Sequence, residues 1–311
     1  MRDKVAVYWG QNSFGSSGQQ AQQSLATYCA NTDIDIIPIS FLLQMSSGQG
    51  GVPVVNFANS GNGCGTFAGT QLLDCPQISK DIQTCQDQYK KTILLSIGGA
   101  TYTEGGFKTE QAAVNMANLI WNMFGPPGTA ATVLRPFHSV SVDGFDLDIE
   151  APTQNFVPFA KRLRALMNAA NTDANLNRQF YLTVAPQCPY PDVNNDAMLN
   201  GGVEFDAVFV QFYNNYCGIQ SFIPGAATQW NYNFDTWNKW AVNGSANPNV
   251  KVFIGVPAGP TAAGSGYLSV ANLKPVIEYS KKFSSFGGIM AWDASQAYVN
   301  TGFLSGIKAA L

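Results

Sequence analysis

The chain has 311 residues, enough for one large domain or two ordinary ones. Seventeen basic and twenty acidic side chains give a net charge of −3, which argues against nucleic acid as a partner because phosphate binding needs a basic surface. Charged residues make up 12% of the chain and hydrophobic residues 46%, so disorder is excluded and the polar surface suits an uncharged ligand, with carbohydrate as the main candidate class.

Short runs of almost continuously apolar residues recur along the chain and predict strands that are covered on both faces. These runs are 5–9, 34–41, 93–97, 144–149, 180–185, 207–212, 250–256 and 287–292. Apolar residues at helical spacing predict helices over 110–124, 156–169, 235–241 and 269–279. Asp235 and Ser269 are candidate N-caps for the last two helices.

Eight parallel strands alternating with helices predict an α/β fold, a (β/α)8 TIM barrel formed by one domain over residues 1–311. A doubly wound open sheet is the alternative, but its glycine fingerprint is missing after the first strand. Polar and aromatic residues gather at the C-terminal ends of the predicted strands, where the functional groups of a TIM barrel lie. The long 42–91 connection holds three cysteines and many glycines, so it is interpreted as disulfide-stapled excursions.

The six cysteines form no C-x-x-C pair, and His138 is the one histidine, so the sequence argues against a zinc site and against a histidine-based catalytic device. His138 is therefore interpreted as a structural or surface residue. Three disulfides in a secreted or cell-wall-associated protein are favoured over buried free thiols. Asn243-Gly-Ser is a possible N-glycosylation acceptor. No apolar run approaches the roughly 20 residues of a membrane span, and no signal-peptide core precedes residue 5.

The strongest motif is the acidic strand Asp143-Gly-Phe-Asp-Leu-Asp-Ile-Glu150. Strand periodicity directs Asp146, Asp148 and Glu150 to one face, into the barrel, roughly 6.6 Å apart. Because three inward acids cannot all ionise at low cost, at least one pKa should be raised, as is typical of acid–base catalysis. A Mg²⁺ or Ca²⁺ site and a structural polar network are the alternatives. The metal alternative is weaker because the acids lie on an apolar strand rather than in a flexible loop.

This strand resembles the D-G-x-D-x-D-x-E signature of family 18 glycoside hydrolases, the chitinases. The stretch Ser96-Ile-Gly-Gly99, on the preceding predicted strand, resembles the S-x-G-G motif of the same family. Further stretches, at 7–12, 185–189, 211–215 and 263–267, resemble the plant class III (hevamine-like) branch and its fungal relatives. The resemblance spans essentially the whole chain and departs in the longer 42–62 and 124–140 segments.

The resemblance implies a TIM barrel and an endo-acting chitinase with a retaining, substrate-assisted mechanism. In it, Glu150 is the general acid and base, Asp148 orients the substrate's N-acetyl group, Asp146 pairs with Asp148 and shares its proton, and Tyr213 donates a hydrogen bond to the acetamido oxygen. The implied substrate-binding residues are Tyr8, Gly98, Gly99, Gln211, Asn214 and Trp292. The implied disulfides are Cys29–Cys85, Cys64–Cys75 and Cys188–Cys217.

The same resemblance sets the expected partners: chitin or chito-oligosaccharides bound by a monomer, without a metal or cofactor. About thirty residues separate the seventh and eighth predicted strands, too few for the α+β insertion that deepens the cleft in another branch of the family, so an open groove is expected. Two alternatives remain, an endo-β-N-acetylglucosaminidase acting on N-glycans and a non-catalytic lectin or inhibitor. The hevamine-like motifs favour the chitinase over the first, and the intact acids and tyrosine argue against the second.

Overall fold

The computed structural model describes residues 2–128 and 132–311, and its centre is a ring of eight parallel strands. The ring closes because β1 pairs with β11 on one side and with β2 on the other. The closed ring confirms the predicted (β/α)8 barrel and shows that the alternative of an open doubly wound sheet is wrong. The ring strands are β1 (Lys4–Val7), β2 (Ile36–Gln44), β6 (Thr92–Gly98), β7 (Gly144–Asp148), β8 (Tyr181–Val184), β9 (Ala207–Gln211), β10 (Lys251–Pro257) and β11 (Phe286–Trp292).

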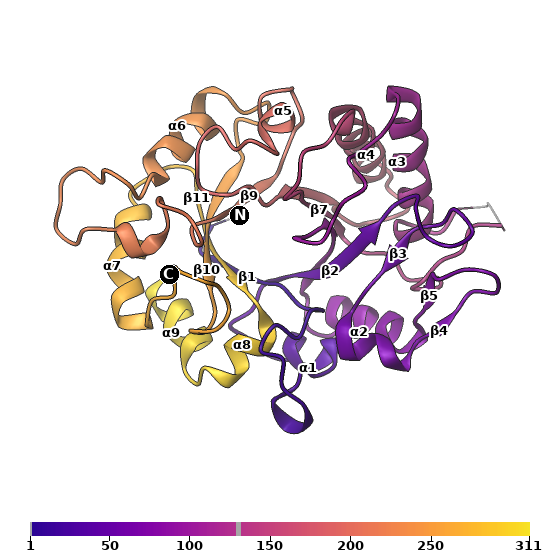
Figure 1. Ribbon diagram of the computed structural model, residues 1–311, viewed down its shortest axis with the longest axis horizontal. Helices are drawn as coiled ribbons and strands as arrows, with labels where there is room; N and C mark the ends of the chain where they lie inside the picture. The colour runs from indigo at the N-terminus through magenta and orange to yellow at the C-terminus, as the bar shows by residue number, and fades with distance from the viewer. Residues whose placement is uncertain (1, 129–131) are drawn as a thin grey trace.

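Helices surround this ring, as Figure 1 shows. Each strand is buried on both faces, so alternate side chains contribute to two different cores. On β7, Phe145 and Leu147 point outward into the large apolar cluster beneath the helices. The smaller cluster inside the barrel includes Tyr8, Phe209 and Phe253. This division leaves the inward positions of β7 to its acids.

The four helices expected from apolar spacing are present and differ from the expected bounds by at most two residues. They are α3 (Glu110–Phe124), α4 (Phe156–Asn171), α6 (Phe234–Asn243) and α7 (Val270–Ser280). The remaining helices are α1 (Leu25–Cys29), α2 (Pro76–Asp87), α5 (Asp196–Leu199), α8 (Ala294–Val299) and α9 (Phe303–Ala310), with short 3-10 turns η1 (Gly18–Gln20), η2 (Ala58–Gly63) and η3 (Ile219–Ser221).

The predicted N-cap of α6 is wrong. The helix begins earlier, with Asn233 at the N-cap position, because the buried ring of Phe234 packs in the core at its first position. Asp235 lies within the first turn and forms an exposed ion pair with Lys239 instead. Ser269 does occupy the N-cap position of α7, but its side chain accepts no capping hydrogen bond.

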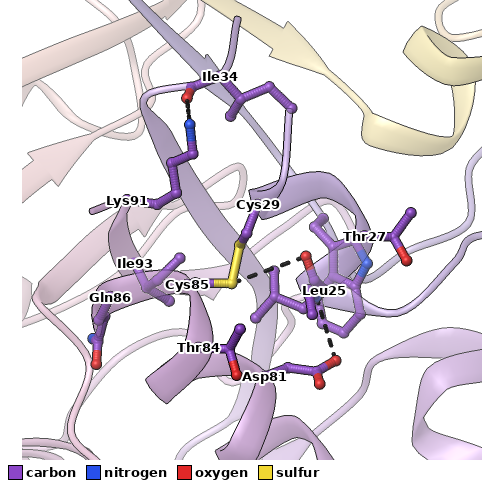
Figure 2. Close-up of a disulfide and its surroundings, with 12 residues drawn as sticks. Leu25, Thr27, Cys29, Ile34, Asp81, Thr84, Cys85, Gln86, Lys91 and Ile93 are labelled. Carbon is purple, nitrogen blue, oxygen red and sulfur yellow. Dashed lines mark hydrogen bonds between the residues drawn. A yellow bond between two sulfur atoms is a disulfide. The ribbon is translucent and has the colours of Figure 1, made fainter. Parts of the chain in front are cut away.

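The 42–91 connection forms excursions at one side of the barrel. β3 (Val54–Val55) pairs antiparallel with the end of β2, and β4 (Gly65–Thr66) pairs with β5 (Leu73–Asp74) in a two-stranded hairpin. The structure confirms the three expected disulfides: Cys29–Cys85, Cys64–Cys75 and Cys188–Cys217. The first joins α1 to α2 (Figure 2), the second closes the hairpin, and the third ties the loop after β8 to the loop after β9.

The segment between β10 and β11 holds a loop and the single helix α7, which confirms that a large insertion is missing there. Residues 129–131, within the 124–140 segment singled out in the sequence, lie outside the described residues. His138 is exposed and its Nε2 lies 2.5 Å from Asp74 Oδ1, in agreement with a surface role. Within residues 2–128 and 132–311, no helix is long and apolar enough to cross a membrane.

Candidate active site

A cavity of about 220 Å³ opens at the C-terminal ends of the barrel strands. This is the end at which TIM barrels carry their functional groups, because the loops that follow the strands meet there. Its lining is mixed, with acidic, amide and aromatic side chains and about as much apolar as polar surface. The lining residues are Gln11, Phe41, Ala100, Thr101, Asp148, Glu150, Gln211, Tyr213, Asn214, Ala262 and Trp292.

Asp146 lies beneath this cavity and is fully buried. The register of β6, β7 and β8 places Ser96, Asp146 and Thr183 side by side in one layer. Asp146 Oδ2 accepts hydrogen bonds from Tyr8 Oη and Ser96 Oγ, both at 2.7 Å, and Oδ1 accepts one from Thr183 Oγ1 at 2.6 Å. Burial raises the pKa of Asp146, while the hydroxyl donors lower it, so the layer partly offsets the cost of the buried carboxyl.

Asp148 lies one step closer to the cavity and is 4% exposed. Its Oδ1 accepts a hydrogen bond from Gln211 Nε2 at 3.0 Å. Burial, and next the charges of Glu150 and Asp146, raise the pKa of Asp148 well above its usual range. The hydrogen bonds of Asp146 lead to three hydroxyl groups rather than to Asp148, so a proton shared between these two acids stays a prediction.

Glu150 ends the acidic series at the rim and is partly exposed to the cavity. Burial raises its pKa, and the negative charge of Asp192 raises it further. A carboxyl group with a raised pKa keeps its proton at a pH where an ordinary glutamate has lost it. The expectation that at least one of the three acids has a raised pKa is therefore confirmed.

Tyr213 and Trp292 contribute aromatic rings to the cavity lining. Tyr213 is 8% exposed, and burial and the charge of Asp148 raise the pKa of its hydroxyl well above its usual range, so this hydroxyl stays a hydrogen-bond donor. The ring of Trp292 stacks on Phe41, with centroids 5.9 Å apart, and contacts Tyr8 at 5.6 Å. Aromatic planes held in this way are suitable surfaces for a sugar ring.

Most of the predicted site residues meet at this cavity. Asp148, Glu150, Gln211, Tyr213, Asn214 and Trp292 line it. Tyr8 lies beneath it and contacts Asp146. Asn214 is exposed, and its Oδ1 accepts a hydrogen bond from Ser265 N at 3.0 Å.

Gly98 and Gly99 do not line the cavity but hold the backbone of Asp148 through close contacts. Gly98 has φ +113°, and a Cβ atom on it would lie 2.2 Å from the carbonyl oxygen of Asp148, so only glycine lets β6 approach β7 this closely. The N–H group of Gly99 donates to the same carbonyl at 2.7 Å. The S-x-G-G motif therefore fixes the backbone of Asp148.

The sequence did not identify every residue of the site. Gln11, Phe41, Ala100, Thr101 and Ala262 also line the cavity. Ser96 belongs to the S-x-G-G motif found in the sequence, but its hydroxyl and that of Thr183 were not predicted to support Asp146. Both interrupt otherwise apolar runs at inward positions of their strands, and this signal could have revealed them. Ala262 has no comparable signal, because its place depends on how the loop after β10 folds back.

A metal is not required by this donor set. The oxygen atoms of Asp146 accept from three hydroxyl groups, as expected of a hydrogen-bonded carboxyl rather than a cation ligand. Among the described residues, no three His, Cys, Asp or Glu side chains are placed to hold one ion together.

Excess EDTA should therefore leave the hydrolytic activity of the protein unchanged, measured as the release of reducing sugar. A loss that Ca²⁺ or Mg²⁺ restores would contradict this prediction.

Comparison with known proteins agrees with the geometry. The family model described as "Glycosyl hydrolases family 18" matches residues 4–272. The chain is 51% identical over 310 residues to a class III chitinase of Arthroderma benhamiae. The aligned region covers 99% of this chain and 86% of that protein.

Two solved plant structures share the fold over nearly the full length. The chitinase ICChI from Ipomoea carnea has a TM-score of 0.77 at 27% identity and covers 99% of this chain and 100% of its own. A xylanase and α-amylase inhibitor protein from Scadoxus multiflorus has a TM-score of 0.76 at 29% identity and covers 98% of both chains. The family match confirms the resemblance found in the sequence, and the chain belongs to family 18 of the glycosyl hydrolases.

Proposed function

We propose that the chain is an endo-acting chitinase that hydrolyses β-1,4 bonds between N-acetylglucosamine units by a retaining, substrate-assisted mechanism. One observation carries this proposal: a carboxyl group with a raised pKa, Glu150, stands at the rim of the cavity two residues beyond the buried Asp148. The class III chitinase that is 51% identical over almost the whole chain supports chitin as the substrate.

In the first step, Glu150 donates its proton to the glycosidic oxygen as the bond to the anomeric carbon breaks. The nucleophile is the carbonyl oxygen of the substrate's own N-acetyl group, which bonds to the anomeric carbon and forms an oxazolinium-type intermediate. A second protein carboxylate is then unnecessary as a nucleophile, which sets this mechanism apart from the usual two-carboxylate scheme. In the second step, Glu150 takes a proton from water, and the water oxygen bonds to the anomeric carbon as the bond from that carbon to the acetamido oxygen breaks. This step regenerates the N-acetyl group and restores the original configuration.

The remaining side chains act on the N-acetyl group and the sugar ring. Asp148 orients the acetamido nitrogen and stabilises the positive charge that develops on the ring of the intermediate. The Tyr213 hydroxyl donates to the acetamido oxygen, and the sugar stacks on Trp292. Gln211 donates to Asp148 and so holds it in place. Asp146, held by three hydroxyl donors, pairs with Asp148 and shares its proton.

The decisive test is a product time course on a chitin oligomer with the anomeric configuration resolved. We expect hydrolysis with the β-anomer formed first, because two displacements at the same carbon retain configuration. Release of glycan from a glycoprotein without cleavage of chitin oligomers would instead identify an endo-β-N-acetylglucosaminidase. Initial formation of the α-anomer would contradict the substrate-assisted mechanism.

Internal cleavage follows from the short connection between β10 and β11. One loop and α7 fill this connection, so no added wall encloses a long row of sugars. Early products from a long soluble chitin derivative should therefore span a range of sizes, with a rapid fall in viscosity. Dominance of disaccharide from the first time points would show exo-acting or processive cleavage and contradict the open groove.

A non-catalytic barrel is the second candidate, since an inhibitor protein shares this fold. The described site argues against it, because the three inward acids, Tyr213 and Trp292 are all in place. Measurable turnover of chitin oligomers would exclude this candidate.

The proposal further assigns residues 1–311 to one catalytic domain that acts as a monomer, secreted or associated with the cell wall. Three disulfides support an oxidising compartment.

A further inference from the structure

The loop between β8 and α5 contains a buried acid that the proposed mechanism does not use. Asp192 is 2% exposed. Its Oδ1 accepts hydrogen bonds from Asn194 N at 3.2 Å, Asn195 N at 2.8 Å and Asn195 Nδ2 at 2.7 Å. These three donors compensate the charge of a carboxylate that is almost withdrawn from water. Its other oxygen, Oδ2, accepts no hydrogen bond from a described residue.

Asn195 connects this acid to the catalytic strand. The residue is 1% exposed, and its Nδ2 also donates to the carbonyl oxygen of Ile149 at 3.0 Å. Ile149 directly precedes Glu150, so this bond fixes the peptide from which the Glu150 side chain projects. A hydrogen bond from a buried side chain to a backbone carbonyl is geometrically specific, because loss of the donor leaves a buried acceptor unsatisfied.

We propose that Asp192 and Asn195 are positioning residues for Glu150: Asn195 fixes the backbone just before the acid, and the carboxylate of Asp192 places a negative charge close to it. The inference rests on the proposed function, since it assigns a task only if Glu150 is the proton donor. The proposed role also explains why an aspartate is buried at position 192, where an asparagine could accept the same hydrogen bonds.

The electrostatic effect on Glu150 agrees with this placement. Burial is the main cause of its raised pKa, and the next cause is the charge of Asp192. The other titratable groups close to Glu150 are Asp148 on β7 and the hydroxyl of Tyr213 just after β9, with Asp146 deeper in the barrel. Of these acids, Asp192 is the one that lies in a loop outside the barrel, where its carboxylate accepts hydrogen bonds from two backbone N–H groups.

The test is the pH profile of kcat/KM for Asp192→Asn, whose amide oxygen can accept the same three hydrogen bonds. Because Glu150 must be protonated to act, removal of the neighbouring charge should move the basic limb of the profile to lower pH. Activity on the acidic side of the profile should stay within about tenfold of wild type, well short of the ~10²-fold loss expected for a missing general acid. Should the Asn variant not fold, Asp192→Ser preserves the turn through its hydroxyl and makes the same prediction.

Two further variants separate charge from geometry. Asn195→Ala keeps the Asp192 charge but removes the donor to Ile149, so kcat should fall several-fold while KM and the basic limb stay in place. Asp81→Asn is the matched control, because Asp81 is also a buried, hydrogen-bonded acid but lies in the helical layer beside the Cys29–Cys85 disulfide (Figure 2). It should leave the profile unchanged.

A basic limb that stays at its wild-type pH in folded Asp192→Asn or Asp192→Ser would overturn the inference. Glu150→Gln, assayed in parallel, distinguishes this failure from failure of the proposed function. If Glu150→Gln loses activity while the Asp192 variants keep the wild-type profile, the function stands and the inference is wrong. If Glu150→Gln keeps its activity, the acid is misassigned and both conclusions are overturned.

Discussion

Glu150→Gln is expected to lower kcat about 10²–10⁴-fold while the barrel stays folded and still binds chitin oligomers. The amide has the shape of the carboxyl group but no transferable proton, so the leaving sugar would have to depart as an unprotonated alkoxide. The contacts of the sugar with Trp292 and Tyr213 are the same in the variant, so substrate binding is retained and KM should change little. The measurement is steady-state hydrolysis of a chitin oligomer, with oligomer affinity measured separately by calorimetry.

Glu204→Gln serves as the control for this substitution. Glu204 is exposed and precedes β9, at the end of the barrel opposite the cavity, so its replacement should leave kcat at the wild-type value. Retention of more than about a tenth of the wild-type rate by Glu150→Gln would contradict its assignment as the acid, since general acids contribute about 10²-fold or more.

Asp148→Asn should have opposite effects on rate and stability. The rate should fall about 10²–10³-fold, the usual effect of removing a group that stabilises charge in the transition state. The variant should nevertheless be more stable than wild type at neutral pH, by about 0.5–2 kcal/mol, as is common when a strained functional group is neutralised. The hydrogen bond from Gln211 can be kept, because the amide oxygen of the substituted side chain accepts it equally well.

The stability difference should depend on pH. The pKa of Asp148 is higher in the folded protein than its ordinary value of 3.8, so the folded state holds a proton that the unfolded state has released. By linkage, this acid lowers the free energy of unfolding as pH rises from about 4 upward, and it has no such effect below both pKa values. The gain of Asp148→Asn should therefore be small at acidic pH and grow toward neutral pH.

Thermal unfolding followed at several pH values checks this directly. Comparison of variant with wild type isolates Asp148 from other titrating acids, including Asp35 and Glu104, whose lowered pKa values give the opposite slope at acidic pH. A stability difference that is constant with pH, or a variant that is less stable at neutral pH, would contradict the prediction.

The barrel could be predicted because its strands carry their own signal. Strands covered on both faces must be apolar throughout, so the runs stand out in the sequence. Elements whose signal is weak or nonlocal were missed. The helix α2 has only a narrow apolar face, with Ile78 and Ile82 among polar residues, and α5 is too short to show periodicity. The pairing of Val54–Val55 with β2 depends on a tertiary contact that no local pattern encodes.

The placement of the acids of β7 could also be predicted from the sequence, because alternation along a strand determines the face on which each side chain lies. The residues that support them were not. Asp192 and Asn195 lie in a loop whose path is set by the fold around it, and their link to Ile149 joins segments that are distant in the chain. Phe41 reaches Trp292 only because the ring closes through β1 and β2. Local periodicity assigns a face, whereas contacts between loops need the whole fold.

The buried layer of Asp146 and its hydroxyl partners has an evolutionary consequence. Three acids that point into a barrel lower its stability, so they are kept only as long as selection acts on catalytic activity. Once such selection is relaxed, a substitution that neutralises Asp148 should make the protein more stable and remove its catalytic activity in the same step. An inactive barrel of this kind would be more stable than the enzyme and would keep the cavity, so it could evolve into a protein that binds carbohydrate without cleaving it.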